Sequence, residues 1–282
     1  MALTKVLITV KTYPTLSTKY EELVCTAGFR EDGTWIRIYP VQFRKKAYAQ
    51  QYSKYQWIEL DLVKHTEDFR PESFRPKAHD TEISILDTIE ADGGSWDERR
   101  KVVMNKVYTN LAALIAEAKD KTKLTSLAVF KPTQVLDIKV KAVEREWDKE
   151  KLARLAQLNI FETKTEQRPE VVKKLPYEFS YEFVDDAGKK STLMIEDWEI
   201  GQLFWNCIKI HMRKGKPEEE AEKLAIADVR YKYLEDFAKT KDLHFYLGTA
   251  KTFHLVSPNP FLIIGTFHAK HLVKKMVQGA LF

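Results

Sequence analysis

The segment DFRPESFRP, residues 68 to 76, concentrates reactive side chains in a short stretch of the sequence. It contains the triplet Phe-Arg-Pro twice, with a carboxylate and a hydroxyl between the two copies. The planar guanidinium group of arginine suits phosphate groups and base edges. Proline fixes its own φ and disfavours helix at the preceding residue, so Arg70 and Arg75 are predicted to lie in a stiff, non-helical loop. Such a loop loses little conformational entropy when it binds a ligand.

The same loop supplies candidate groups for proton transfer. Asp68 and Glu72 are the carboxylates nearest to the arginines, and either could position or activate a water molecule. His65 and His79 flank the loop and could carry protons. The alternative interpretation is a surface loop in which the acids and the arginines neutralise one another.

Two strand-like runs nearby, WIRIY from residue 35 and WIELDL from residue 57, carry a second set of polar and aromatic side chains. Side chains alternate between the two faces of a strand, so the isoleucines and leucines of both runs are expected to face the core. If the two strands are neighbours, their opposite face carries Trp35, Arg37, Tyr39, Trp57, Glu59 and Asp61.

A face of this composition is suited to nucleic acid. Aromatic rings stack on bases, arginine contacts phosphates, and a carboxylate accepts a hydrogen bond from an exocyclic amine. Phe74 in the neighbouring loop is a further stacking candidate. In the alternative interpretation this is a second packing face, with Trp35 and Trp57 buried under a helix and Arg37 paired with Glu59 across strands.

A cluster of acids in the C-terminal half offers a rival site. Glu196, Asp197 and Glu199 could bind Mg²⁺ or share acid and base roles, as in a metal-dependent nuclease. Asp197 is equally a good helix N-cap, with Glu199 in the first helical turn.

The turn FHLVSPNPF, residues 253 to 261, contains two further candidates. His254 could be catalytic and Asn259 could contact a base. An asparagine before a proline is also a common turn former, and both interpretations stay open.

The sequence lacks the usual signatures of metal and cofactor sites. Its seven histidines show no HxH or HExxH spacing, and its two cysteines are too few for a cysteine-based zinc site, so no metal is predicted. The glycine-bearing loops match neither a P-loop nor a dinucleotide fingerprint, and no cofactor is expected. Cys25 is interpreted as a buried structural thiol rather than a nucleophile.

The pattern along the chain predicts an α+β fold. The first ninety residues alternate in the manner of strands, and Asp32-Gly33 is a strong hairpin signal, so a mostly antiparallel sheet or small barrel is expected there. A helical middle follows, with Ser95 and Glu98 at capping-box spacing. The polar residues 162–174 are the best candidate boundary. The predicted domains are a β-barrel with a helical extension at 1–161 and an α+β domain at 175–282, or else one continuous fold.

Composition and charge narrow the class of protein. The 282 residues carry a net charge of +5, of which residues 1–64 contribute +4. This basic N-terminal part is compatible with a nucleic-acid partner, or with a generally basic protein. No apolar run reaches the roughly 18 residues of a membrane span. The N-terminus lacks signal-peptide features, so a cytoplasmic location is expected.

With VCTAGFREDGTWIRIYPVQFR, residues 24 to 44, a family resemblance can be stated. Residues 5–90 resemble the small β-barrels of the PUA and ASCH-like superfamily in strand order and in the arginine–aromatic face. The resemblance implies a PUA-like barrel that handles RNA or modified, flipped bases. The ASCH signature G-x-K-x-x-E-x-R is absent, so no site residues are transferred. The whole chain also resembles uncharacterised prokaryotic phage-defence proteins, which would imply action on foreign DNA.

The sequence therefore predicts a nucleic-acid-binding protein, DNA favoured over RNA, that recognises a modified or flipped base. The leading enzymatic hypothesis is a hydrolase of the DNA glycosylase type; the alternatives are a metal-dependent nuclease and a non-catalytic reader of modified nucleic acid. The candidate residues are Glu72 and Asp68 for catalysis, and Trp35, Arg37, Tyr39, Trp57, Arg70, Phe74, Arg75 and Asn259 for binding.

Overall fold

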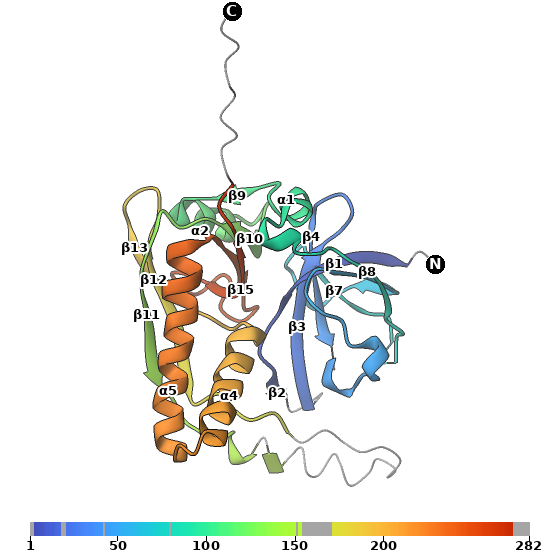
Figure 1. Ribbon diagram of the computed structural model, residues 1–282. Helices are drawn as coiled ribbons and strands as arrows, with labels where there is room; N and C mark the ends of the chain where they lie inside the picture. Colours follow the sequence, from blue (N-terminus) through green and yellow to red (C-terminus); the bar gives the residue numbers. More distant parts are fainter. Residues whose placement is uncertain are drawn as a thin grey trace, which may run out of the picture.

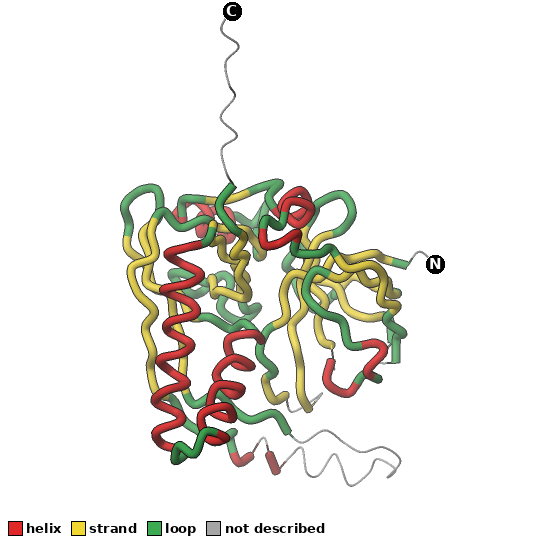
Figure 2. The backbone as a smooth tube through the Cα atoms, in the orientation of Figure 1, coloured by secondary structure: helices red, strands yellow, loops and turns green. Residues whose placement is uncertain are grey.

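The computed structural model describes residues 3–17, 21–41, 43–78, 80–150, 152–153 and 171–272. Strands and helices are both well represented in these residues, and they confirm the predicted α+β class (Figures 1 and 2). The N-terminal strands gather on one side of the molecule and the two long C-terminal helices on the other (Figure 1). None of the helices in the described ranges has the length and hydropathy needed to cross a bilayer.

The N-terminal part is a curled, mostly antiparallel sheet, as predicted. Among the described residues it has eight strands in the order β6-β7-β4-β3-β1-β5-β8, with β2 paired to β3. The hairpin at Asp32-Gly33 joins β3 to β4, and Gly33 has the positive φ of 76° that such a turn requires. The strands are β1 (Thr4–Lys11), β2 (Thr15–Ser17), β3 (Glu21–Phe29), β4 (Trp35–Val41), β5 (Gln56–Leu60), β6 (Leu62–Lys64), β7 (Ser73–Pro76) and β8 (Ser84–Thr88).

The C-terminal part contains two further sheets. One has the strand order β15-β14-β10-β9 and the other β11-β12-β13 in the described residues. The strands are β9 (Val107–Tyr108), β10 (Leu127–Phe130), β11 (Gln134–Ala142), β12 (Tyr177–Val184), β13 (Lys190–Met194), β14 (Asp242–Thr249) and β15 (Phe261–Ala269).

Helices occupy the middle and the C-terminal half. The α-helices are α1 (Asp97–Val103), α2 (Leu111–Lys119), α4 (Trp198–Arg213) and α5 (Glu218–Arg230), and α5 continues into a π-helical stretch, η4 (Tyr231–Ala238). The short 3₁₀ turns are η1 (Phe43–Lys45), η2 (Tyr48–Gln50) and η3 (Asp92–Gly94). The capping-box prediction is wrong, because α1 begins after Trp96 without a side-chain cap, and Ser95 Oγ donates to the carbonyl of Asp92 instead.

The central strands of the N-terminal sheet are buried on both faces, whereas its edge strand β8 is mostly exposed. The side chains on the inner face of the curled sheet, such as Ile8, Ile38 and Ile58, pack against one another. The other face of the sheet packs against the four-stranded sheet, where Phe29 meets Tyr246 in one cluster. The sheet is therefore a layer between two cores, and little of its surface is left as an open platform.

The predicted domain boundary at residues 162–174 lies mostly outside the described residues. Strands β9 and β10 pair within the sheet that also contains β14 and β15, and β11 pairs with β12 along its whole length. Residues 107–142 are thus hydrogen-bonded into the C-terminal sheets, while the division into two domains at 161 and 175 stays a prediction.

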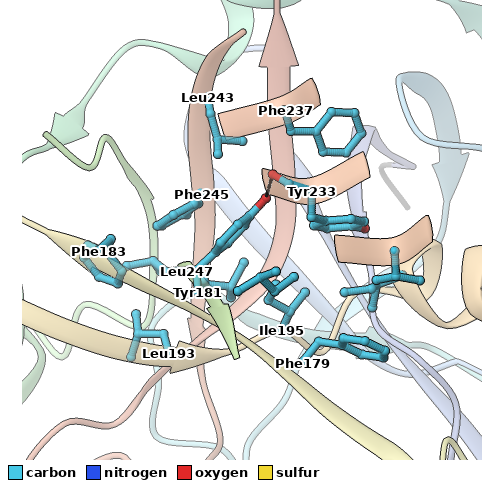
Figure 3. Packing of buried hydrophobic residues seen from close by; sticks show 14 of the residues in the cluster. Phe179, Tyr181, Phe183, Leu193, Ile195, Tyr233, Phe237, Leu243, Phe245 and Leu247 are labelled. Atoms are coloured by element: carbon cyan, nitrogen blue, oxygen red, sulfur yellow. Dashed lines mark hydrogen bonds between the residues drawn. The ribbon is translucent and has the colours of Figure 1, made fainter. Parts of the chain in front are cut away.

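An aromatic core fills the space between the three-stranded sheet, the four-stranded sheet and the helices (Figure 3). Phe179, Tyr181 and Phe183 project into it from β12, and Phe245 stacks on Tyr181 at 5.2 Å between ring centroids. The hydroxyl of Tyr181 donates to the backbone carbonyl of Tyr233 at 2.6 Å. This hydrogen bond satisfies a polar group that is fully buried.

Replacing Tyr181 by phenylalanine should lower the free energy of unfolding by about 1–2 kcal/mol, because a buried hydrogen bond is lost and a small void replaces the hydroxyl. Urea denaturation followed by circular dichroism measures this difference. The matched control is Tyr231→Phe, whose side chain is 67% exposed; it should leave the midpoint unchanged. Equal midpoints for all three proteins would contradict the assignment.

Candidate functional site

The segment 68–76 is only half a loop. Its first part is a turn, but Ser73–Pro76 forms β7, which runs parallel to β4 and antiparallel to β6. The prolines keep the segment out of helix as predicted, and the second one ends the strand. The segment lies against β10 and the end of β14, so it joins the N-terminal sheet to the four-stranded sheet.

Asp68 and Arg70 form a buried ion pair. Each is 5% exposed, and Asp68 accepts hydrogen bonds from Nε and Nη2 of Arg70 at 2.8 and 2.5 Å. Burial by itself would raise the pKa of Asp68, but the hydrogen bonds and charge of Arg70 hold it well below its usual range. The remaining terminal nitrogen of Arg70 donates to the backbone carbonyl of Thr249. For this pair the neutralised-loop alternative holds, and Asp68 is a poor candidate for a general base.

The carboxylate of Glu72 is hydrogen-bonded to Ser126. It accepts from the backbone nitrogen of Ser126 at 3.1 Å and from the Ser126 hydroxyl at 2.8 Å. Arg37 donates to the same hydroxyl at 2.8 Å and to the Ser126 carbonyl at 3.1 Å. Glu72 therefore fixes the serine that orients Arg37, and Arg37 does not pair with Glu59.

A cavity of about 390 Å³ opens beside these two arginines, between β3, β4 and the segment that follows β14. We call it the arginine pocket. Its polar and aromatic lining comprises Thr12, Tyr13, Thr15, Cys25, Arg37, Tyr39, Arg70, Glu196, Thr249, Lys251 and Thr252. Three predicted binding residues, Arg37, Tyr39 and Arg70, thus lie at one cavity.

The two guanidinium groups make the pocket electropositive. Burial, and after it the charge of Arg70, lowers the pKa of Arg37, which nevertheless stays charged because arginine does not deprotonate in proteins. Arg37 has no carboxylate at ion-pair distance within the described part of the chain. Among the described residues its donors go to the hydroxyls of Ser73 and Ser126 and to the Ser126 carbonyl, and these groups are neutral. An anionic or acceptor-rich ligand would therefore be stabilised beside it.

Glu196 is the acid that lines the arginine pocket, whereas the sequence predicts Glu72 or Asp68 for this role. Its backbone is held between the two halves, since its carbonyl accepts from Tyr13 and its nitrogen donates to Ile263. Burial, and then the charge of Glu178, raises the pKa of its carboxyl. The alternation of a strand separates Glu196 from Asp197, and this signal was available in the sequence.

Asp197 and Glu199 belong to a different contact. Both accept from Lys54 Nζ, at 2.9 and 2.8 Å. Asp197 also caps α4, accepting from the backbone nitrogen of Glu199 at 3.3 Å, which confirms its predicted capping role. Over the described ranges, no three His, Cys, Asp or Glu side chains converge as a metal site would require. The three acids therefore do not form the cluster that the nuclease alternative needs.

The predicted two-strand face does not exist as one surface. Strands β4 and β5 are separated in the sheet by β3 and β1, so Trp35 and Trp57 lie apart. Trp35 packs on Phe29 at 4.0 Å and against Tyr246 at 5.8 Å between ring centroids, in line with the packing alternative. The ring of Trp57 is instead covered by Lys5, whose Nζ lies 5.0 Å from it.

Phe74 and Arg75 lie away from the arginine pocket. The ring of Phe74 is flanked by the Arg30 guanidinium at 4.6 Å and by Lys64 Nζ at 5.0 Å. Arg75 is exposed and donates to the carbonyls of Pro76 and Lys77. Any contact of Phe74 or Arg75 with nucleic acid would therefore be made outside the arginine pocket.

The C-terminal turn is structural. Asn259 accepts from the backbone nitrogen of Phe261 at 3.1 Å, as the turn-forming alternative predicts. The ring of His254 is fully buried and bonds the Thr249 hydroxyl at 2.7 Å and the Ala118 carbonyl at 2.8 Å. Of the two flanking histidines, His65 has a buried Nδ1 without a hydrogen-bond partner in the described residues, and His79 lies outside them.

Cys25 lines the arginine pocket and is half-buried. Burial raises the pKa of its thiol despite the nearby charges of Arg37 and Arg70. The thiol is therefore protonated near neutral pH, which makes it a weak nucleophile. Neither Tyr13 nor Lys251, which complete the pocket, carries a local sequence signal for this role, because only the packing of the two halves brings them to it.

The residues that line the arginine pocket come from two regions that match different family models. One model, described as "Domain of unknown function (DUF8758)", matches residues 2–105, and another, "Domain of unknown function (DUF8757)", matches residues 107–282. The second covers more than half of the chain. The chain belongs to the DUF8757 family.

Other comparisons add little. No curated protein matches the DUF8757-family chain. One solved structure, a murine DNA-binding protein bound to double-stranded DNA, is similar over 98% of this chain and 99% of its own, at 9% identity and a TM-score of 0.31. A TM-score at this level does not establish a shared fold.

Replacing Asp68 by asparagine should destabilise the protein by roughly 3–5 kcal/mol at neutral pH, because it leaves the Arg70 charge buried without its partner. The folded-state pKa of Asp68 lies below its unfolded value of about 4. Its stabilisation is therefore present above that pH and is lost as the pH falls below it. Urea titrations of both proteins between pH 7 and pH 3 should show the difference narrowing at the acid end.

The control for this prediction is Glu67→Gln, because Glu67 is exposed in the same turn and forms no ion pair with other described residues. It should change the free energy of unfolding by less than about 0.5 kcal/mol. A difference between wild type and Asp68→Asn that stays constant over the whole pH range would contradict the ion-pair account.

Proposed function

We propose that this chain binds nucleic acid and takes a single base into the arginine pocket. The observation that carries the proposal is the convergence of Arg37, Arg70, Tyr39 and Glu196 on one cavity of about 390 Å³. A cavity of this size is in the range of small-molecule sites and has room for a nucleoside but not for a duplex. A base within a duplex would have to leave the stack to enter it.

Each side chain has a chemical counterpart in a nucleotide. The guanidinium groups of Arg37 and Arg70 offer donors to phosphate oxygens or to base acceptors. The rings of Tyr13 and Tyr39 offer surfaces for stacking. A carboxyl such as Glu196 donates when protonated and accepts from an exocyclic amine when ionised.

The surface beside the pocket also favours base extrusion. The segment that follows Thr252 exposes Phe253, Leu255 and Val256, which are 59%, 44% and 74% exposed. Phe69, next to Arg70, is 43% exposed, and its ring contacts that of His254 at 5.4 Å. Exposed apolar side chains of this kind act as wedges between base steps in proteins that unstack DNA.

Hydrolysis of the base–sugar bond is the enzymatic form of this proposal. Glu196 lines the cavity, has a raised pKa and has no ion-pair partner in the described ranges, so it suits a general acid. It replaces Glu72 and Asp68, which the structure engages elsewhere. The PUA-like resemblance, the phage-defence role and the cytoplasmic location stay predictions from sequence, and a non-catalytic reader is the simpler form of the same proposal.

Affinity for DNA should fall steeply as salt rises, since phosphate contacts release counterions. Lys251 is exposed at the pocket, and Lys251→Gln should reduce the slope of log affinity against log salt by about 1. Fluorescence anisotropy over a salt series measures both slopes. The control, Lys216→Gln in the turn between α4 and α5, should behave as wild type, and salt-independent affinity would contradict the proposal.

Glu196→Gln should abolish abasic-site formation on base-modified DNA while leaving binding within about threefold, because shape and hydrogen-bonding reach are kept. Since the acid form is the active one, wild-type activity should decline as the pH rises through the raised pKa of Glu196. Glu67→Gln is the matched control and should keep full activity, with and without EDTA. Activity retained in Glu196→Gln would contradict the catalytic form of the proposal. DNA binding by the wild type without any product would support the non-catalytic reader.

A further inference from the structure

A second cavity, of about 460 Å³, has none of the arginine-pocket residues in its lining. We call it the Trp96 pocket. Its walls come from the turn before β5, the start of α1, the π-helical stretch η4 and the end of β15. Tyr55, Trp96, Phe237 and His268 make it largely aromatic, and Arg99 and Lys232 make it basic.

Arg99 is a buried cation on which the carboxylates of Glu90 and Asp92 act only from beyond ion-pair distance. It is 9% exposed, its Nε donates to the Ile89 carbonyl at 2.8 Å, and it forms no ion pair within the part of the chain that the structure describes. The guanidinium lies 4.0 Å from the ring centre of Tyr55 and 4.7 Å from that of Trp96. Its two terminal nitrogens have no hydrogen-bond partner among the described residues. Arg99 lines the cavity, and its unused donors would stabilise an anion there.

The aromatic residues beside Arg99 have strained backbones. Tyr55 and Trp96 have φ values of 63° and 58°, in the left-handed region that bulky residues rarely adopt. Their rings contact each other at 5.3 Å. Backbone hydrogen bonds from Tyr55 to Ile8 and from Ile89 to Tyr55 hold one of them in place. Strain of this kind persists where the surroundings impose it, and it concentrates at ligand clamps.

The other side of the cavity offers a hydrogen-bond acceptor. Lys54 is held between the buried Asp197 and the 47% exposed side chain of Glu199. Two carboxylates share one ammonium group, so the exposed edge of Glu199 keeps negative charge for a ligand donor. The ring of His268 stacks on Phe237 at 3.7 Å; burial lowers its pKa to about 4, so it is neutral at pH 7.

We infer that the Trp96 pocket binds a nucleoside monophosphate, with the phosphate at Arg99, the base along the aromatic wall and an exocyclic amine at Glu199. A cation and a carboxylate that line the same aromatic cavity fit a planar ligand with an anionic group and an amine. Lys232 also lies at the cavity with its side chain 46% exposed, and its Nζ is paired with Asp236 at 2.6 Å, so it adds a weaker positive charge than Arg99 does. The cavity volume suits one mononucleotide. This inference is independent of the arginine pocket.

Isothermal titration calorimetry of the full chain tests the inference with AMP, IMP, adenosine and inorganic phosphate. AMP should bind; adenosine and phosphate should each bind at least tenfold more weakly, because each lacks half of the contacts. IMP should also bind more weakly, since it carries a carbonyl where AMP has the amine that Glu199 accepts from.

Arg99→Gln should weaken AMP binding by about tenfold or more, whereas Lys101→Gln, exposed on the same helix, should leave it unchanged. Lys232→Gln is a second variant, and because the Lys232 side chain is 46% exposed it should not disturb folding. It should weaken AMP binding several-fold, which keeps the inference testable even if Arg99→Gln fails to fold. Failure of folded wild type to bind AMP at millimolar concentration would overturn the inference. So would phosphate binding as tightly as AMP, or AMP binding that is lost in Lys251→Gln but kept in Lys232→Gln.

Discussion

The structure depends on two buried arginines that fasten the N-terminal sheet to the four-stranded sheet. Arg70 reaches from the turn before β7 to the carbonyl of Thr249 at the end of β14, and Arg37 reaches from β4 to Ser126 before β10. A buried guanidinium group is costly unless its donors are satisfied, so these bonds fix the distance and orientation of the two sheets. The apolar contacts between the sheets, such as that of Trp35 with Tyr246, add buried area but do not fix a direction.

This fastening also creates the arginine pocket. A guanidinium group has five N–H donors in a fixed fork, and Arg70 uses three of them on Asp68 and Thr249 among the described residues. The same side chains that brace the interface therefore present charge to the cavity between the sheets. Replacing either arginine would therefore disturb the interface between the sheets as well as the pocket, whereas a substitution of the exposed Lys251 would leave that interface intact.

The segment 195–197 links the two halves from the other side. It bridges β1 and β15, with isolated pairings from Asp197 to Thr12 and from Ile195 to Ile263. Strand alternation sends Glu196 to the arginine pocket and Asp197 to Lys54, which also contacts Glu199 in the Trp96 pocket. Adjacent residues of one short segment thus contribute to both regions: Glu196 lines the arginine pocket, and Asp197 holds the Lys54 that lines the Trp96 pocket.

The sequence by itself determined the elements whose signals are local. The hairpin at Asp32-Gly33, the N-cap of α4 at Asp197 and the α+β class follow from turn chemistry, capping and periodicity, which act over a few residues. It also singled out Arg37, Tyr39 and Arg70 as binding residues, because arginines and aromatics in strands and stiff loops are unusual enough to notice. Only the tertiary structure decided what these residues face. Strand order separated Trp35 from Trp57, and the packing of two sheets brought Glu196, Tyr13 and Lys251 to the arginines across long stretches of chain. It also placed Trp96, with a strained backbone, where a cap by Ser95 is expected from the sequence. Asp68 and Glu72, which the sequence predicts as catalytic acids, instead bind Arg70 and Ser126. Alternation fixes the face of a side chain, but the partner on that face depends on contacts between distant segments, which no local pattern encodes.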